Sequence, residues 1–536
     1  MKTRKTYLAA AIAATAIALL SASPVRAQHH AHTPTLGKVQ FKVDCNEAAQ
    51  REFNLAMAYY HSFAWNHLNE PLERVLKADP TCGMAHWARA LGMLDNPFTW
   101  PGAISAKTLA EGPVALEAAR ATGLKSQRER DYVDALAVFF KDHDKLNHRA
   151  RAKALEDAMA QVAQRYPDDK EASILYALVL SANFDPTDKQ YANQLKAAGI
   201  LEPISKEQPD HPGVAHYLIH SYDYPALASR GMDAARRYGK LAADASHALH
   251  MPSHIFTRVG AWKESIESNA ASAKAGTDKT FDKWHAYDYM VYAHLQLGQE
   301  AAARQVIRDA QTIPTKVDNF PIAYAYGAMP ARFALERGAW AEAAKLDLTP
   351  APSAFAWNKY PQAEAVNAFA RGVGAAATKD ATQARAEVAR LVKLRDATTG
   401  YWAGQIDIQS EVVRGLATIA EGKTDEGIEM LRQAATREDA TEKHVVTPGP
   451  LLPAREVLAS ALLDAGKPAD ALREYDTVLT KEPNRLRATG GAGLAAERSG
   501  DKQKARLHYT KVMELTASAD APRPEAVNAK KFLGRG

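Results

Sequence analysis

The stretch LASALLDAGKPADALREYDTVLTKEPN at residues 458–484 is followed by GAGLAAERSGDKQKARLHYTKVMEL at residues 491–515. Three pairs of matching residues are each separated by 34 positions: Gly466 and Gly500, Ala471 and Ala505, and Tyr475 and Tyr509. This period is typical of a tetratricopeptide (TPR) helix-turn-helix repeat, in which glycine makes the turn and a small residue lets the second helix approach the first. The two segments therefore predict tandem antiparallel helices.

The same pattern extends toward the N-terminus with looser spacing. Glycines between alanine-rich amphipathic segments mark further turns: Gly260, Gly298, Gly338 and Gly422. No segment has the strict alternation of a half-buried strand. We therefore expect an all-α, TPR-like α-solenoid of about twelve helical hairpins, with successive first helices side by side. Prolines near residue 349 suggest a division into arrays at 46–348 and 349–536.

The N-terminus predicts export. Residues 1–27 combine a basic start, a short apolar stretch and a small residue at Ala27, as in a secretory signal peptide, and residues 28–45 form a leader. Removing 1–27 takes four positive charges and no negative ones from the net charge of +5, which leaves +1. We expect a periplasmic or secreted protein that is not an integral membrane protein. The small net charge offers no reason to expect nucleic-acid binding.

The chain has two cysteines, Cys45 and Cys82. In an oxidising compartment an even pair favours a disulfide. Here it would clamp the segment before the first helix to the second hairpin. Two buried thiols are the alternative.

The candidate site begins with HALHMPSHIF at residues 247–256, which holds His247, His250 and His254. At 100° per residue these positions fall on one side of a helix. Pro252 removes one backbone donor and should interrupt that helix.

The neighbouring repeats carry similar stripes. DHPGVAHYLIHSYDYP at 210–225 places His216, His220 and Asp223 on one face of a helix, and His211 or Asp210 can cap its start. His285 shares a face with Asp288 and Tyr292 in the next first helix. Since first helices of successive hairpins are neighbours, these stripes should meet.

Paired imidazoles with nearby carboxylates suit a divalent transition metal, and zinc, copper or iron would all accept them. The predicted metal ligands are His216, His220, His250 and His254. The predicted residues around them, as outer-shell or ligand-binding groups, are His61, His211, Asp223, His247, His285, Asp288 and Tyr292. Six histidines would also suffice for a binuclear copper site.

Other sequence patterns give weaker indications of function. Arg332 and Glu336, four residues apart, predict a salt bridge within one helix. The loop 438–456 holds Glu442, His444 and Arg455 and is either a solvated connector or the rim of a groove. No zinc-protease HExxH motif and no GxSxG nucleophile elbow occurs.

Two functions fit these observations. The first is a histidine-rich concave pocket that binds a divalent transition metal or a small polar ligand, with catalysis left open. The alternative is a periplasmic scaffold that binds a protein or peptide of the cell envelope without metal. A peptide groove should display Asn, Lys and Arg, whereas the middle first helices display His, Asp and Tyr, which favours the pocket.

Four strings together resemble a family of exported bacterial TPR proteins with the motifs HPGxxHYxIHxYD and HAxHMPSHIF. They are CGMAHWARAL (82–91), HPGVAHYLIHSYD (211–223), HALHMPSHIFTRVGAW (247–262) and EDATEKHVVTPGPLLPARE (438–456). The resemblance covers almost the whole mature chain. It implies a helical-repeat fold and export to the envelope, and it implies no particular activity. Ala88 and Val445 stand where the family has Gly and Pro.

Overall fold

The computed structural model describes residues 34–277, 281–313 and 319–534. The predicted signal peptide, 1–27, and the first part of the predicted leader lie outside the described residues. Those residues are helices and connecting loops and include no strand.

The helices follow one another throughout the described residues. Those of the first half are α1 (Glu47–His61), α2 (Asn69–Ala78), α3 (Gly83–Gly92), α4 (Ala106–Ala121), α5 (Gln127–Phe140), α6 (His148–Arg165), α7 (Lys170–Ala182), α8 (Ala192–Glu207), α9 (Pro212–Tyr222), α10 (Met232–Leu241), α11 (Ser246–His250), α12 (Pro252–Arg258) and α13 (Trp262–Ala275). Those of the second half are α14 (Asp282–Gln296), α15 (Glu300–Thr312), α16 (Phe320–Glu336), α17 (Trp340–Ala343), α18 (Pro361–Ala377), α19 (Ala381–Asp396), α20 (Gly400–Ala420), α21 (Thr424–Asp439), α22 (Ala454–Asp464), α23 (Pro468–Lys481), α24 (Leu486–Arg498), α25 (Lys502–Leu515) and α26 (Pro524–Leu533). Short 3₁₀ turns are η1 (Trp65–His67), η2 (Pro97–Thr99), η3 (Ala228–Gly231), η4 (Trp357–Lys359) and η5 (Thr516–Ser518).

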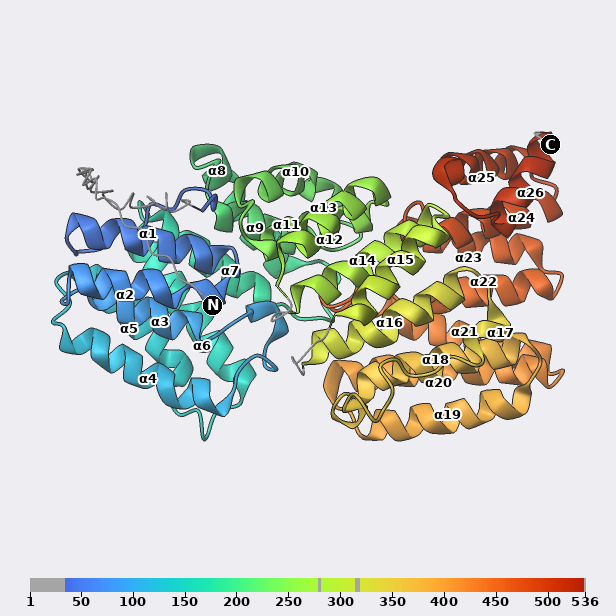
Figure 1. Cartoon of the computed structure of the whole chain (residues 1–536), viewed down its shortest axis with the longest axis horizontal. Helices are drawn as coiled ribbons and strands as arrows, with labels where there is room; N and C mark the ends of the chain where they lie inside the picture. The colour runs from blue at the N-terminus through green and yellow to red at the C-terminus, as the bar shows by residue number, and fades with distance from the viewer. Residues whose placement is uncertain (1–33, 278–280, 314–318, 535–536) are drawn as a thin grey trace, which may run out of the picture. The chain divides into compact units, whose positions relative to one another are not determined.

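Consecutive helices pack as hairpins (Figure 1). The pairs run from α1–α2 through α9–α10, continue with α11 and α12 against α13, and end with α24–α25 before the closing helix α26. First helices of successive hairpins also touch, as in α14 with α16 and α16 with α18. The prediction of an all-α TPR-like solenoid of about twelve hairpins is confirmed for the described residues. The division at residue 349 stays a prediction.

The turn glycines explain why the hairpins form where the sequence places them. All six have positive φ, which a side chain would resist: Gly260, Gly298, Gly338, Gly422, Gly466 and Gly500. The Gly260 turn also lies against the carbonyl of Pro483, where a Cβ atom would clash. That contact joins two turns more than 220 residues apart, and the side chain of Trp262 reinforces it by donating to the carbonyl of Asn484 at 2.9 Å.

The N-terminal segment after residue 34 packs onto the first hairpins. Phe41 is fully buried against Phe53, Trp87 and Tyr132, with ring centroids 5.2–5.6 Å away. This part of the predicted leader therefore belongs to the hydrophobic core.

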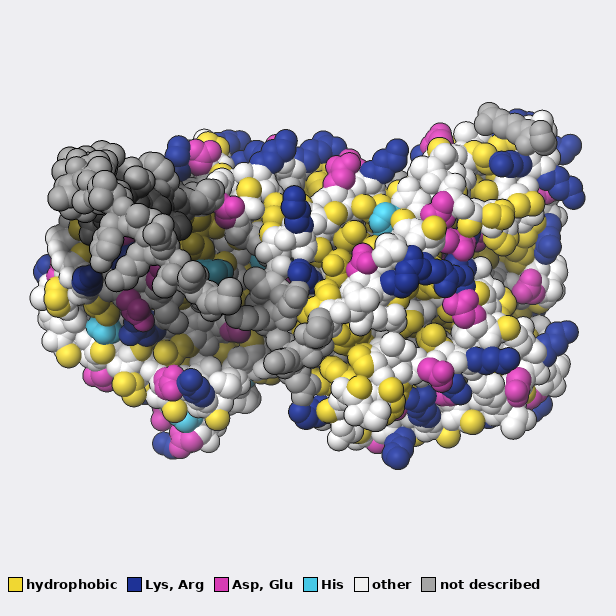
Figure 2. All heavy atoms as spheres, viewed as in Figure 1, with side chains coloured by type: hydrophobic (Ala, Val, Ile, Leu, Met, Phe, Trp, Pro, Cys, Tyr) yellow, Lys and Arg dark blue, Asp and Glu magenta, His cyan; other side chains and the backbone are white. Residues whose placement is uncertain are grey.

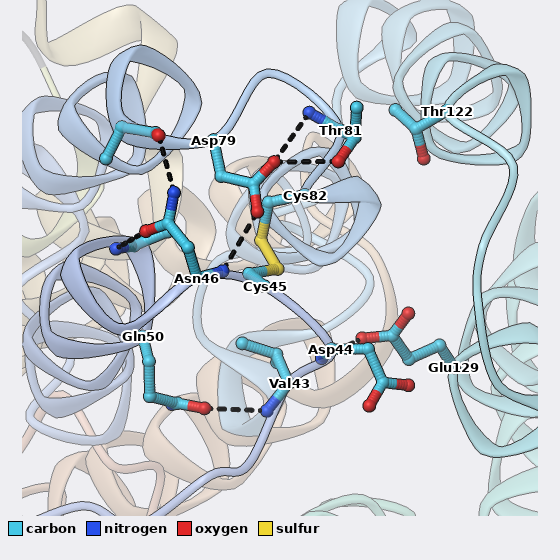
Figure 3. Close-up of a disulfide and its surroundings, with 12 residues drawn as sticks. Val43, Asp44, Cys45, Asn46, Gln50, Asp79, Thr81, Cys82, Thr122 and Glu129 are labelled. Atoms are coloured by element: carbon cyan, nitrogen blue, oxygen red, sulfur yellow. Dashed lines mark hydrogen bonds between the residues drawn. A yellow bond between two sulfur atoms is a disulfide. The ribbon is translucent and has the colours of Figure 1, made fainter.

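The predicted disulfide between Cys45 and Cys82 is confirmed (Figure 3). It joins the residue before the N-cap of α1 to the N-cap of α3. Beside it, the backbone N–H of Asn46 donates to Asp79 at 2.9 Å. The bond therefore anchors the N-terminal segment to the second hairpin, as its spacing suggested.

The surface carries both signs of charge, with acidic and basic side chains interspersed over the face shown in Figure 2. Among the described residues, no helix has both the length and the apolar character needed to cross a bilayer.

Candidate metal centre

The histidine motifs lie on α9, α11, α12 and α14. α9 contacts α12 and α11 contacts α14, which brings the motifs together (Figure 1). At the start of α9 the side chain of His211 accepts from the backbone N–H of Val214, and Pro212 occupies the first helical position. Met251 keeps helical backbone angles between α11 and α12, so Pro252 interrupts the hydrogen bonding of an almost continuous helix.

Among the residues that the structure describes, three groups of side chains each bring their potential ligand atoms within 4.8 Å of one another. We call them the first triad, the second triad and the glutamate group. The first triad is His216, His220 and His247, the second triad is His250, His254 and His285, and the glutamate group is His61, Glu171 and His211. The four predicted ligands are thus divided between two triads, which His247 and His285 complete.

In the first triad, His216 is oriented by the backbone. Its Nδ1 donates to the carbonyl oxygen of His61 at 2.7 Å, which leaves Nε2 of the neutral ring without a hydrogen. That Nε2 atom lies 3.2 Å from Nε2 of His247. The buried Nε2 of His220 has no hydrogen-bond partner, and its ring stacks on Phe98 with centroids 3.7 Å apart.

In the second triad, two rings are held in the same way. Nδ1 of His250 donates to Oδ1 of Asn269 at 2.7 Å, and the amide of Asn269 is oriented because its Nδ2 donates to the carbonyl of Ser265. Nδ1 of His254 donates to Asp223 at 2.8 Å. Both Nε2 atoms therefore lack a hydrogen, and they face each other at 3.0 Å. The buried Nδ1 of His285 has no hydrogen-bond partner.

The two triads adjoin. Ring centroids of His220 and His254 are 6.2 Å apart, and those of His247 and His250 are 6.3 Å apart. Five of the six rings are buried and His247 is partly buried. That they line the concave face of the solenoid stays a prediction. Phe63 and Phe98 cover the first triad, since Phe63 stacks on His247 and Phe98 on His220.

Burial keeps these imidazoles neutral. It lowers the pKa well below the ordinary value for five of the rings, and neighbouring histidines lower it further: His216, His220, His247, His250 and His285. Burial also lowers the pKa of His254, although Asp223 opposes the effect. Neutral imidazole is the form that binds metal ions, so both triads could hold one.

The glutamate group is different because its donors and acceptors match. Glu171 accepts from Nε2 of His211 at 2.9 Å and from Nε2 of His61 at 3.1 Å. Nδ1 of His61 accepts from the hydroxyl of Tyr217, and Nδ1 of His211 accepts from Val214. Burial would raise the pKa of Glu171, but His211 and His61 outweigh it and hold it far below its ordinary value. The hydrogen bonds of this group are complete without a metal.

Asp223 lies behind the second triad. Besides His254, its carboxylate accepts from Nε of Arg258 and from Nζ of Lys443, both at 2.8 Å. Burial would raise the pKa of Asp223, but Lys443, Arg258 and His254 hold it well below its ordinary value. The charged carboxylate therefore fixes the orientation of His254.

Asp288 and Tyr292 lie outside the triads. Nε of Arg332 donates to Asp288 at 2.9 Å, and the hydroxyl of Tyr292 donates to Glu482. The predicted salt bridge between Arg332 and Glu336 is wrong: Arg332 pairs with Asp288, and Glu336 pairs with Arg485 at 2.8 Å. Asp288, Tyr292 and Glu336 each pair with a residue from a later repeat, and not with the residues on their own helix that the spacing suggested.

Several residues of the site escaped sequence reasoning. Asn269 stands with Ser265 and Ser272 on the buried face of α13, and this polar stripe is visible as spacing of four and three residues. Arg258 follows His254 by four residues and could have been found in the same way. Lys443 could not, because its partner Asp223 is 220 residues away.

Comparisons with known proteins add no family. No protein-family model matches the chain, and no curated protein matches it either. Solved structures with similar folds include a tetratricopeptide repeat protein from Parabacteroides merdae, at 12% identity over 68% of this chain and 98% of that one, with a TM-score of 0.25. Yeast Tom70 is 11% identical over 91% of this chain and 88% of its own, with a TM-score of 0.30. The Cut9–Hcn1 hetero-tetramer of APC/C matches at 10% identity over 91% of this chain and 97% of that one, with a TM-score of 0.28.

Proposed function

We propose that this protein binds two divalent transition-metal ions, one in each triad. The observation that carries the proposal is the pair of Nε2 atoms of His250 and His254, which face each other at 3.0 Å while each ring donates its only hydrogen elsewhere. Two lone pairs at this distance in a buried site repel each other. A cation between them turns the repulsion into attraction.

The distances fit two ligands of one ion. With metal–nitrogen bonds of roughly 2.0–2.1 Å and angles between 90° and 110°, two ligand nitrogens are about 2.8–3.4 Å apart. The Nε2 atoms of His250 and His254 at 3.0 Å, and of His216 and His247 at 3.2 Å, both fall in this range. A proton could replace the metal only in an imidazolium, which burial disfavours.

The outer contacts also suit metal ligands. A ligating imidazole commonly donates its other ring hydrogen to a carboxylate or carbonyl, which fixes the ring and raises its basicity. The carbonyl of His61, the amide of Asn269 and the carboxylate of Asp223 supply such acceptors. Three imidazoles per ion leave coordination positions free, as in catalytic rather than purely structural sites.

The donor set suits zinc, copper or iron, since imidazole ligates all three. The test is elemental analysis of untagged protein, exported to the periplasm and reconstituted separately with each metal. We expect two ions per chain that survive dialysis. His216→Ala and His254→Ala should each remove about one ion, because each takes one nitrogen from a set of three.

His143→Ala is the matched control, since His143 is exposed on the loop between α5 and α6 and should leave the metal content unchanged. A reconstituted protein without bound metal, or full metal content in both triad variants, would contradict the proposal.

We also propose that the chain belongs to the exported bacterial TPR family whose motifs it resembles, and that it works in the periplasm or outside the cell. The disulfide supports this location, because such bonds persist in oxidising compartments. N-terminal sequencing of the protein from a periplasmic fraction should begin at Gln28.

A further inference from the structure

A cavity of about 830 Å³ is linked to the second triad through Asp223. Arg258 and Lys443 form part of its wall, and both bind Asp223, which holds His254. Other lining residues come from α16, α18, α20 and the loop after α21, so the cavity is built from distant parts of the chain. Its volume is that of a small-molecule site.

Two cations in this wall share one carboxylate. The side chains of Arg258 and Lys443 are 10% and 4% exposed, and each contacts Asp223 at 2.8 Å. Asp223 has a third partner in His254. The cluster therefore keeps an excess positive charge where solvent screens it little.

The acidic side chains of the wall do not offset this charge, because each is paired with another cation or has a raised pKa. Burial raises the pKa of Glu438 to about 8, so its neutral form predominates near neutral pH. Glu442 is paired with Lys189, and Asp439 with Arg455 and Lys481. Glu482 shares Arg485 with Glu336 and Glu456, and burial raises the pKa of Glu482.

The rest of the wall is aromatic. Tyr324 and Trp402 pack with ring centroids 5.4 Å apart, and Phe369, Tyr191 and Tyr401 also face the cavity. The hydroxyl of Tyr401 donates to the carbonyl of Glu442 and accepts from the backbone N–H of His444, which ties the loop to α20. A planar apolar group could stack against these aromatic rings.

We propose that this cavity binds a small aromatic carboxylic acid, with its carboxylate on Lys443 and Arg258 and its ring against Trp402 and Tyr324. Both cations have N–H groups to offer an anion, and a carboxylate would supply the second negative charge that they lack. This inference does not depend on the metal proposal, because it needs neither triad to be loaded.

The probe is 2-naphthoate, titrated by calorimetry into the full-length protein, with neutral 2-naphthalenemethanol as its partner compound. We expect one naphthoate per chain and binding about tenfold or more tighter than that of the alcohol, since a charge-assisted hydrogen bond is lost. This comparison uses the unaltered protein, so it does not depend on how any variant folds. Equal affinity for both compounds, or no binding of naphthoate at millimolar concentration, overturns the proposal.

Variants locate the ligand. Lys443→Met should weaken naphthoate and leave the alcohol unchanged, whereas Trp402→Ala should weaken both. Lys504→Met removes the same charge from an exposed pair with Asp476 and should change neither. Naphthoate binding that survives Lys443→Met but disappears in His254→Ala would place the ligand at the histidines and also overturns the proposal. The metal content of each sample, measured in parallel, tests the two proposals separately.

Discussion

The glutamate group and the second triad are both buried clusters built around histidine, yet they satisfy their nitrogens differently. In the glutamate group every ring nitrogen meets a complementary partner within the protein, with Glu171 between His61 and His211. In the second triad His250 and His254 donate their Nδ1 hydrogens outside the cluster, and their Nε2 atoms, which carry no hydrogen, face each other. Helix spacing alone does not separate the two cases. The two cases are distinguished by the group that contacts the other nitrogen of each ring, because that group decides which of the two ring nitrogens carries the hydrogen.

The strongest way to break this comparison is Glu171→Ala. It leaves His61 and His211 buried without their shared acceptor, and we expect a loss of about 3–5 kcal/mol in the free energy of unfolding of the N-terminal hairpins. Metal content should stay near that of the unaltered protein. Urea denaturation followed by circular dichroism, with elemental analysis, checks both. Glu171→Gln is the milder control, because its amide oxygen retains one bond. Loss of both ions in the folded variant would show that the glutamate group is part of the metal site.

The second test asks how much the contact between the turn after α12 and a later repeat contributes to stability. Gly260 ends the turn after α12 and lies against Pro483, whereas Gly422 has positive φ but no neighbour within 4 Å of a Cβ atom. Gly422→Ala should cost about 1–2 kcal/mol from backbone strain alone. Gly260→Ala should cost at least about 1 kcal/mol more, because it adds a steric clash. Thermal unfolding of the two variants measures the difference, and equal melting temperatures would contradict the close approach.

The third test removes an acceptor outside the triad. Asn269→Leu should weaken metal binding by about 10–100-fold, because His250 loses the group that fixes its ring. Competition with a chelator measures the affinity. Asn269→Asp keeps an acceptor and should retain most of it. Ser272→Ala, in the same helix and with no hydrogen-bond partner, is the matched control. An affinity unchanged in Asn269→Leu would mean that this contact does not orient a ligand.

The fourth test compares the carboxylate of Glu438 with that of Glu171. Glu171 accepts hydrogen bonds from two imidazoles, whereas Glu438 accepts from the backbone N–H of Ala454, and desolvation raises the pKa of Glu438 to about 8. Since the folded state holds this proton more tightly than the unfolded chain, the contribution of Glu438 to stability is greatest at low pH and is lost as pH rises through about 8. Between pH 6 and pH 8 the unaltered protein should lose about 2 kcal/mol relative to Glu438→Gln. Urea midpoints of both proteins across this range check the sign, and parallel curves would refute it.

Much of the fold could be predicted from local pattern. The 34-residue period and the turn glycines predict the hairpins, and both cysteines lie where those hairpins bring them together. The four central histidines were also predictable, because their spacing places them on adjoining faces of neighbouring helices. Asp288 and Tyr292 share such a face with His285 but turn to Arg332 and Glu482, which no local pattern reveals.

By itself, the sequence determined the helical repeat, its turns and the gathering of histidines, since helix periodicity and glycine backbone freedom act over a few residues. Only the tertiary structure decided how six histidines divide into two triads and why His61 and His211 pair with a glutamate instead. It also decided that the loop 438–456 borders a cavity and reaches Asp223 through Lys443. The physical reason is that a ring's hydrogen position depends on its second partner. For His216, His250 and His254 these partners lie 155, 19 and 31 residues away in the chain.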